Sequence, residues 1–415
     1  MSDLSPTFHA GSSMSGTEAL FQLPEMFYSR TDERGVIKAG NMVFRRVAGY
    51  DWPDLLGAPH KIIRHPDTPK AVFHLLWENI KAGRATGAYV KNQRKGGRAY
   101  WVFALVAPVD GGYVSTRIKP SSKLFGEIEE LYADILAREK SEGLTSEQSA
   151  EALTRAVQAM GYANYDSFQS HALASEFEAR ARQLGRPIGQ LQRRFMDMSK
   201  AITQVESETT ELTEAIKSIR TVPMNMRIIA SRLENAGGPI SAISVNYSQM
   251  LEEMSTWVTT FVDGDACVFA RIRDSILRGQ FLSFASGLET EMTEHFRATD
   301  QEYPSNVIPE DEIAQLSALQ QEFSEAMTAV LQKVETEAKR FARSVLDMKR
   351  YVTGLSSTRM MCKIESAALS NSGTALAGIV DQLDECQEEI EQRLAKLVEL
   401  NSVVQGNTSM LRTLV

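Results

Sequence analysis

Residues 61–101 read KIIRHPDTPKAVFHLLWENIKAGRATGAYVKNQRKGGRAYW, and they hold the densest mixture of polar, aromatic and cationic residues in the chain. Pro69 near a first helical turn and Gly83 behind a last one predict a helix over residues 69–82. Two extended runs follow, residues 87–95 and 99–109, with a turn at residues 95–98. A ligand, if the protein binds one, is expected here.

The residues on either side complete a small domain. Residues 27–37 read as two strands with a turn at Glu33-Arg-Gly35, and residues 112–119 read as a further strand. Short helices are expected at residues 41–48 and 54–57. The order β-β-α-α-α-β-β-β predicts an α+β domain, with an antiparallel five-stranded sheet and a helical flank on one face.

From Pro120 onward the apolar pattern is helical. Residues 124–186 predict several short helices. Two series of apolar residues follow, separated by a break at Pro223 and Gly237-Gly-Pro239. Within each series the residues are alternately three and four apart, a spacing typical of coiled-coil seams. The first series runs from Ile188 to Ile219 and the second from Ile240 to Phe261.

The same plan recurs toward the C-terminus. A third seam runs from Leu316 to Leu355, a tip is expected at Ser370-Asn-Ser-Gly373, and a fourth seam runs from Leu376 to Val404. An internal repeat of two helical hairpins is therefore predicted, and its four helices would form an intramolecular four-helix bundle or pair in a homodimer. The expected segments are a lead-in (1–26), the α+β domain (27–121), a helical connector (122–186), hairpin 1 (187–262), a helical linker (263–311) and hairpin 2 (312–415).

Composition restricts the function classes. A formal charge of −8 disfavours nucleic-acid binding, because a basic face is what neutralises phosphates. Three cysteines without metal-ligand spacing argue against disulfides and zinc and fit a reducing cytoplasm. We expect no signal peptide and no membrane span. Since nucleophile–base pairs and nucleotide-binding loops are missing, we expect a protein that is not an enzyme.

The α+β region resembles the PAS domain of bacterial aerotaxis receptors, which are flavin-binding sensors of cellular redox state. The resemblance covers about residues 27–121. A tryptophan ten residues after the Asp of Arg64-His-Pro-Asp67, together with the later Lys-Asn-x-Arg-Lys run, makes it specific. The matching elements are Asn41, Gly49-Tyr50, Pro59-His60, Arg64-His-Pro-Asp67, Pro69-Lys70, Phe73, Trp77, Val90-Lys-Asn-x-Arg-Lys-x-Gly97 and Tyr100-Trp-Val102.

The resemblance implies FAD as the cofactor. An isoalloxazine ring needs an apolar slot with hydrogen-bonding partners, and its pyrophosphate needs cationic donors. The sequence departs from the family at Thr86, where a tryptophan usually stands six residues before the asparagine. The positions that match the family's flavin-binding residues are Asn41, Arg64, His65, Asp67, Trp77 and Asn92.

Each of these residues also has an ordinary structural interpretation. Trp77 could be a core residue, His65 a surface histidine, and Asp67 the N-terminal cap of the following helix. The methionines along the helical seams are more typical of an adaptable core than of a partner surface.

The hairpins resemble the signalling hairpin of chemoreceptors in a degenerate form. Met224-Asn-Met-Arg-Ile-Ile-Ala-Ser-Arg-Leu-Glu-Asn-Ala236 keeps Asn225 and Glu234 of the chemoreceptor pattern, but Ala230-Ser-Arg232 replaces its second Asn-Ala-Ala. The resemblance implies a signalling partner, either the chemotaxis kinase and its coupling protein or another regulator.

These observations predict a cytoplasmic sensor of redox state or oxygen that binds FAD and signals through a helical bundle. Two alternatives stay open. One is a PAS scaffold without a cofactor that binds a partner through its coiled coil. In the other, haem or a small metabolite replaces the flavin, with His60, His65 or His74 available as ligands.

Overall fold

The computed structural model describes residues 21–232, 237–262, 267–298, 303–304, 307–368 and 373–415. Most of the expected lead-in and most of the second expected tip lie outside these ranges. Gly237-Gly-Pro239, expected as the first tip, instead begins a helix over Gly237–Phe261. The chain divides into two compact units. The first comprises residues 1–188 and 284–323, and the second comprises residues 189–283 and 324–415.

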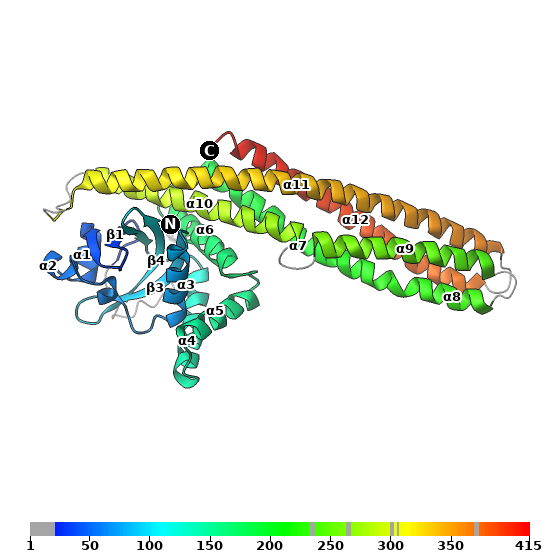
Figure 1. The fold of residues 1–415 in the computed structure, drawn as a ribbon, viewed down its shortest axis with the longest axis horizontal. Coiled ribbons are helices and arrows are strands. Elements are labelled where there is room, and N and C mark those ends of the chain that lie inside the picture. The colour runs from blue at the N-terminus through cyan, green and yellow to red at the C-terminus, as the bar shows by residue number, and fades with distance from the viewer. Residues whose placement is uncertain (1–20, 233–236, 263–266, 299–302, 305–306, 369–372) are drawn as a thin grey trace, which may run out of the picture. The chain divides into compact units, whose positions relative to one another are not determined.

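A five-stranded antiparallel sheet forms the centre of the first unit, with the strand order β2-β1-β5-β4-β3 (Figure 1). The expected turn between the first two strands is present, and Gly35 occupies it with φ 75°, which a residue with a Cβ rarely adopts. The predicted sheet is therefore confirmed. Its strands are β1 (Met26–Asp32), β2 (Ile37–Gly40), β3 (Thr86–Gln93), β4 (Ala99–Val109) and β5 (Gly112–Ile118).

Four short helices between β2 and β3 cover one side of this sheet, which we call the inner face. Side chains alternate across a strand, so Ser115 and Arg117 of β5 point to the inner face and Thr116 points to the opposite, outer face. On the inner face, the Phe27 ring of β1 lies 5.3 Å from the Phe44 ring. The covering helices are α1 (Met42–Ala48), α2 (Trp52–Leu55), the 3-10 helix η1 (His60–Ile63) and α3 (Lys70–Lys81).

Helices from later parts of the chain cover the outer face. Tyr89 donates a hydrogen bond to Glu176 of α6 (2.8 Å), and Thr116 donates one to Glu289 of α10 (2.7 Å). Because both faces are covered, most of β5 is buried. The helices concerned are α4 (Leu124–Ser141) and α6 (Tyr165–Gln183), together with the parts of α10 (Val268–Arg297) and α11 (Pro309–Ala368) that belong to this unit; α5 (Ser146–Ala159) packs against α3.

On the outer face, Glu312 of α11 forms a buried ion pair and hydrogen bonds with strand β1. Its carboxylate, 1 % exposed, accepts hydrogen bonds from the Tyr28 hydroxyl (2.6 Å) and from Arg30 Nη2 (2.7 Å) and Nε (2.9 Å). A guanidinium that donates two parallel bonds fixes the position of a carboxylate as well as neutralising it. This contact holds the start of α11 on strand β1.

The second unit is a bundle of long helices. Helix α7 contacts α12, and α8 contacts α9. Trp257 of α9 donates to the carbonyl of Ser344 in α11 (3.0 Å), and Asn401 of α12 donates to the carbonyl of Ala338 (3.2 Å). The predicted all-α region after the sheet is thus confirmed. Its helices are α7 (Gln190–Ser218), the 3-10 helix η2 (Ile219–Thr221), α8 (Val222–Arg232), α9 (Gly237–Phe261), the remaining parts of α10 and α11, and α12 (Gly373–Leu411).

Pro223 interrupts a helix without ending the helical segment. Helix α7 stops at Ser218, one 3-10 turn follows, and α8 begins at Val222. Pro223 is the second residue of α8, where a missing backbone N–H costs little because that group has no partner inside the helix.

No helix in the described ranges is long and apolar enough to cross a lipid bilayer.

Glu289 generates the first testable prediction. Burial raises the pKa of its carboxyl from the ordinary 4.5 to about 8. The folded protein therefore keeps a proton that the unfolded chain releases, and the free energy of unfolding should fall as pH rises from about 4.5 to about 8. Glu289→Gln removes this slope, which reaches at most about 1.4 kcal/mol per pH unit for one group.

The measurement is urea denaturation at several pH values, followed by tryptophan fluorescence. A Trp257→Phe background leaves all remaining tryptophans in the first unit. The exposed Glu310→Gln is the matched control. Parallel pH profiles for the Glu289 variant and its parent would show that Glu289 does not hold this proton.

Candidate ligand-binding site

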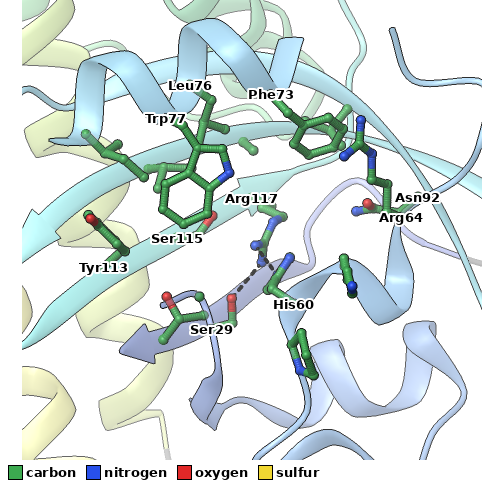
Figure 2. A pocket seen from close by; sticks show the side chains of 18 of the residues that line it. Ser29, His60, Arg64, Phe73, Leu76, Trp77, Asn92, Tyr113, Ser115 and Arg117 are labelled. Atoms are coloured by element: carbon green, nitrogen blue, oxygen red, sulfur yellow. Dashed lines mark hydrogen bonds between the residues drawn. The ribbon is translucent and has the colours of Figure 1, made fainter. Parts of the chain in front are cut away.

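A cavity of about 290 Å³ lies between the inner face of the sheet and helices η1 and α3 (Figure 2). Small-molecule sites in proteins begin at about 300 Å³, so the space suits a compact ring system. Most of its lining is apolar or aromatic. The main apolar contributions are Phe73, Leu76, Trp77 and Ile80 of α3, Val90 of β3, and Ala104 and Val106 of β4.

Two buried polar atoms on the cavity wall have no hydrogen-bond partner. They are Nδ2 of Asn92 on β3 and Oγ of Ser115 on β5. A buried donor or acceptor without a partner costs about 1–3 kcal/mol, and natural proteins rarely leave one without a reason. The two atoms are therefore suited to hydrogen-bond a ligand.

Arg117 is a further polar residue of the cavity wall. It is 4 % exposed, and it donates to Ser29 Oγ (3.0 Å) while its Nη2 lies 2.7 Å from His60 Nε2 (Figure 2). Burial lowers the pKa of the Arg117 guanidinium to about 10. Burial and the neighbouring Arg117 charge hold the pKa of His60 well below its ordinary value, so His60 is neutral and its Nε2 accepts the hydrogen bond.

The structure brings three of the six predicted site residues together around this cavity. Arg64 follows η1, and its guanidinium carbon lies 3.6 Å from the centre of the Phe73 ring. Trp77 points down from α3, with its ring 5.5 Å from Tyr113 in an edge-to-face contact. The backbone of Arg64 pairs with that of Asn92, which joins η1 to β3.

His65 and Asp67 do not line the cavity. The Asp67 carboxylate lies 3.5 Å from Lys91 Nζ, and the Asp67 backbone N–H donates to His65 Nδ1 (3.1 Å). These contacts fasten the segment before α3 to strand β3. The interpretation of Asp67 as a helix cap is wrong, because α3 begins at Lys70 and the carboxylate of Glu139 accepts its first backbone N–H (2.7 Å).

Asn41 also lies outside the cavity lining. Its side chain is fully buried, and its Oδ1 accepts the backbone N–H groups of Phe44 (3.0 Å) and Tyr28 (3.1 Å). Its Nδ2 donates to the carbonyl of Met26 (2.8 Å). Asn41 therefore caps α1 and ties that helix to strand β1.

Thr86, the position at which the sequence departs from the resembled family, is engaged elsewhere. Its hydroxyl donates to Gln169 Oε1 of α6 (2.8 Å), and the same oxygen accepts the Gly87 backbone N–H. A tryptophan at residue 86 would remove the hydroxyl that bonds to α6.

The sequence pattern did not point to Ser29, Ser115 or Arg117 as site residues, and it indicated His60 only as part of the resemblance and as a possible haem ligand. The available signal was the order Val114-Ser-Thr-Arg-Ile118, in which three polar residues stand together in a strand. No group of three or more His, Cys, Asp or Glu residues is placed to hold a metal ion within the described ranges.

Comparison with known proteins agrees with the fold. Residues 40–116 match the model of the PAS fold family. Two light-oxygen-voltage domains of known structure are also similar to the chain. One belongs to a blue-light activated histidine kinase of Erythrobacter litoralis (15% identity, 22% of this chain, 90% of that chain, TM-score 0.21), and the other was studied with a flavin analogue (20% identity, 28% of this chain, 87% of that chain, TM-score 0.22). The match to the family model identifies a PAS domain at residues 40–116.

One characterised protein is similar in sequence over this domain. A stretch of 109 residues is 39% identical to the aerotaxis receptor of Escherichia coli (strain K12), and it covers 25% of this chain. The match spans 22% of the receptor's length. The match is therefore confined to the PAS-based sensor region and does not extend to the rest of either protein.

Asn41→Ala tests whether Asn41 acts through structure or through ligand contact. We expect a loss of about 2–4 kcal/mol in the free energy of unfolding, because three buried backbone groups lose their partner. Asn164→Ala is the matched control, since Asn164 caps α6 through one backbone N–H, that of Ser167, and also accepts the Ser167 hydroxyl; its loss should cost about 1 kcal/mol. Urea denaturation gives both values. A stable Asn41 variant that has lost a ligand would instead indicate direct contact.

Proposed function

We propose that this protein is a sensor of redox state or oxygen that binds FAD in the cavity of its PAS domain. The observation that carries the proposal is a set of buried polar groups among the apolar and aromatic side chains of the cavity wall. Asn92 Nδ2 and Ser115 Oγ line the cavity without a hydrogen-bond partner, and the buried Arg117 guanidinium bonds to the neutral Ser29 and His60. Similarity of the domain to the aerotaxis receptor supports the same class of function.

The residues present suit a flavin. The aromatic and aliphatic side chains of α3 and β4 offer flat apolar walls for a tricyclic ring. Asn92 and Ser115 offer the hydrogen bonds that a ring with amide-like edges requires. Cationic side chains of Arg34, Lys61 and Arg64 line the cavity as well and would attract the phosphates of the dinucleotide. When bound, the flavin supplies reversible uptake of electrons.

The six predicted residues would then serve in two ways. Arg64, Trp77 and Asn92 would contact the cofactor, because all three line the cavity. His65 and Asp67 would hold the loop that carries Arg64 against Lys91. Asn41 would hold α1 on the sheet and so keep the cavity in shape.

We further propose that the sheet passes the state of the cavity to the helices on its outer face. On β5, Arg117 faces the cavity while Thr116 bonds to Glu289. On β1, Ser29 accepts from Arg117 while Tyr28 bonds to Glu312. A shift of either strand would therefore disturb α10 and α11, which continue into the helical bundle.

The output would be binding of a signalling protein, either a chemotaxis kinase with its coupling protein or another regulator. This part of the proposal rests on the chemoreceptor-like sequence of the hairpins, and it gives the protein a regulatory role in the cytoplasm, without catalysis.

A haem-binding version of the sensor is less well supported. His60 Nε2 already lies in hydrogen-bonding contact with Arg117, and His65 Nδ1 accepts the Asp67 backbone N–H. A scaffold without any cofactor is the other alternative, and the polar groups described above would then stay without partners.

Absorbance of the purified full chain separates these alternatives. We expect flavin bands that bleach with dithionite, whereas a Soret band would indicate haem, and a colourless protein after reconstitution with FAD would contradict the proposal. Arg64→Gln should weaken FAD binding by about tenfold or more, because a guanidinium–phosphate contact is charge-assisted. Arg98→Gln, an exposed arginine on the turn after β3, should bind FAD like the parent.

Glu312→Gln tests the proposed route to the helices. Hydrogen exchange of residues 284–297 and 309–323 should differ between the oxidised and reduced protein, and the difference should shrink in this variant because the charged contact with Arg30 is lost. Exchange is read by mass spectrometry, with the exposed Glu310→Gln as the matched control. If reduction changes exchange equally in both variants, the Glu312 contact does not carry the signal.

A further inference from the structure

Arg117 is a cation buried without a counter-ion. It is 4 % exposed, and the ion pairs found in the described part of the chain do not include it. Buried charges in proteins are ordinarily paired with an opposite charge, because leaving water costs several kcal/mol per ion. Burial is also the main reason why the pKa of the Arg117 guanidinium is lowered.

The groups around the guanidinium are all neutral. Ser29 Oγ accepts from Nη1 at 3.0 Å, and His60 Nε2 lies 2.7 Å from Nη2. The Phe27 ring centre lies 5.7 Å from the guanidinium carbon. Tyr100 is a further neighbour whose hydroxyl lacks a partner, and burial raises its pKa, so it is not an anion at neutral pH.

The cavity is where a counter-charge could lie. Arg117, His60 and Ser29 all line it, and Figure 2 shows the three side chains converging beneath Trp77. His60 cannot supply the negative counter-charge. Because its pKa is lowered, it is neutral and adds no positive charge either. A ligand that carries or gains negative charge at this end would complete the arrangement.

We propose that Arg117 sets the reduction potential of the bound flavin by stabilising the negative charge that reduction adds; the inference rests on the proposed FAD site. Two electrons and one proton added to a neutral flavin ring leave it with one negative charge, and a second proton would cancel that charge. Arg117 disfavours the second proton and favours the anion. The electrons come from an external reductant, dithionite in the experiment below.

The test compares the full-length protein with Arg117→Met, which keeps most of the side-chain volume but removes the charge, and with Arg117→Lys, which keeps the charge. The exposed Arg98→Met is the control. Bound FAD is quantified first by absorbance. The midpoint potential is then measured by dithionite titration against a reference dye at several pH values.

In the Met variant, the equilibrium ratio of reduced to oxidised flavin should be at least tenfold lower than in the parent. This corresponds to a midpoint potential lower by about 30 mV or more for a two-electron couple. Arg117→Lys should retain most of the parent potential, and Arg98→Met all of it. The parent should also show a slope of about 30 mV per pH unit, the value for one proton per two electrons, down to mildly acidic pH.

Several results would overturn the inference. If the parent takes up FAD but the Met variant keeps its potential, Arg117 does not set it, while the FAD proposal stands. A parent that binds no FAD ends both. Should the Met variant fail to fold, the parent alone still decides, because a slope of about 59 mV per pH unit at neutral pH would mean two protons per two electrons and no stabilised anion.

Discussion

Strand β5 must satisfy polar side chains on both faces of a sheet that water does not reach. Ser115 and Arg117 point to the inner face, and Thr116 points to the outer face. A buried polar group that lacks a partner costs as much as a large fraction of a domain's stability, so each of these residues constrains what lies opposite it. The ligand site and the docking of α10 both follow from this constraint.

The polar side chains on the two faces have different kinds of partner. On the outer face, the protein supplies its own partners: Glu289 accepts from Thr116, and Glu312 accepts from Tyr28 and Arg30. On the inner face, Ser29 and His60 occupy only part of the donor capacity of Arg117. On the outer face the polar contacts therefore come from the chain itself, although Glu289 Oε1 has no hydrogen-bond partner. On the inner face, Asn92 Nδ2 and Ser115 Oγ have none, and a ligand in the cavity could supply one.

Local patterns predicted the sheet, whereas the candidate site residues came from the family resemblance. The turn at Gly35, the helix ending before Gly83 and the alternating strands depend on neighbours in sequence, and these features appear where they were expected. Arg64, Trp77 and Asn92 line the cavity, as the resemblance implied. Asn41 caps the local helix through Phe44, but its other two partners are backbone groups of a strand thirteen or more residues away, which its local pattern does not show.

Arg117 was beyond the reach of such patterns for a different reason. An arginine near the end of a strand reads as solvent-exposed unless both faces of the sheet are known to be covered. Arg117 lies on the inner face, where its neighbour His60 stands 57 positions earlier in the chain. The outer face of the same strand is covered by residues 284–323, more than 160 positions later in the chain, within a region expected to be mainly a linker.

The contact between β5 and α10 on the outer face could also transmit a change in the cavity to the helices. Because Thr116 and Arg117 are adjacent, a change in charge beside the guanidinium acts on the same strand that Glu289 holds. Glu289 is buried and Thr116 is the hydrogen-bond partner of its Oε2, while its Oε1 has none, so a displacement that broke this bond would leave the whole carboxyl without a partner. The contact is therefore sensitive to small movements of β5, which a contact between exposed residues would absorb.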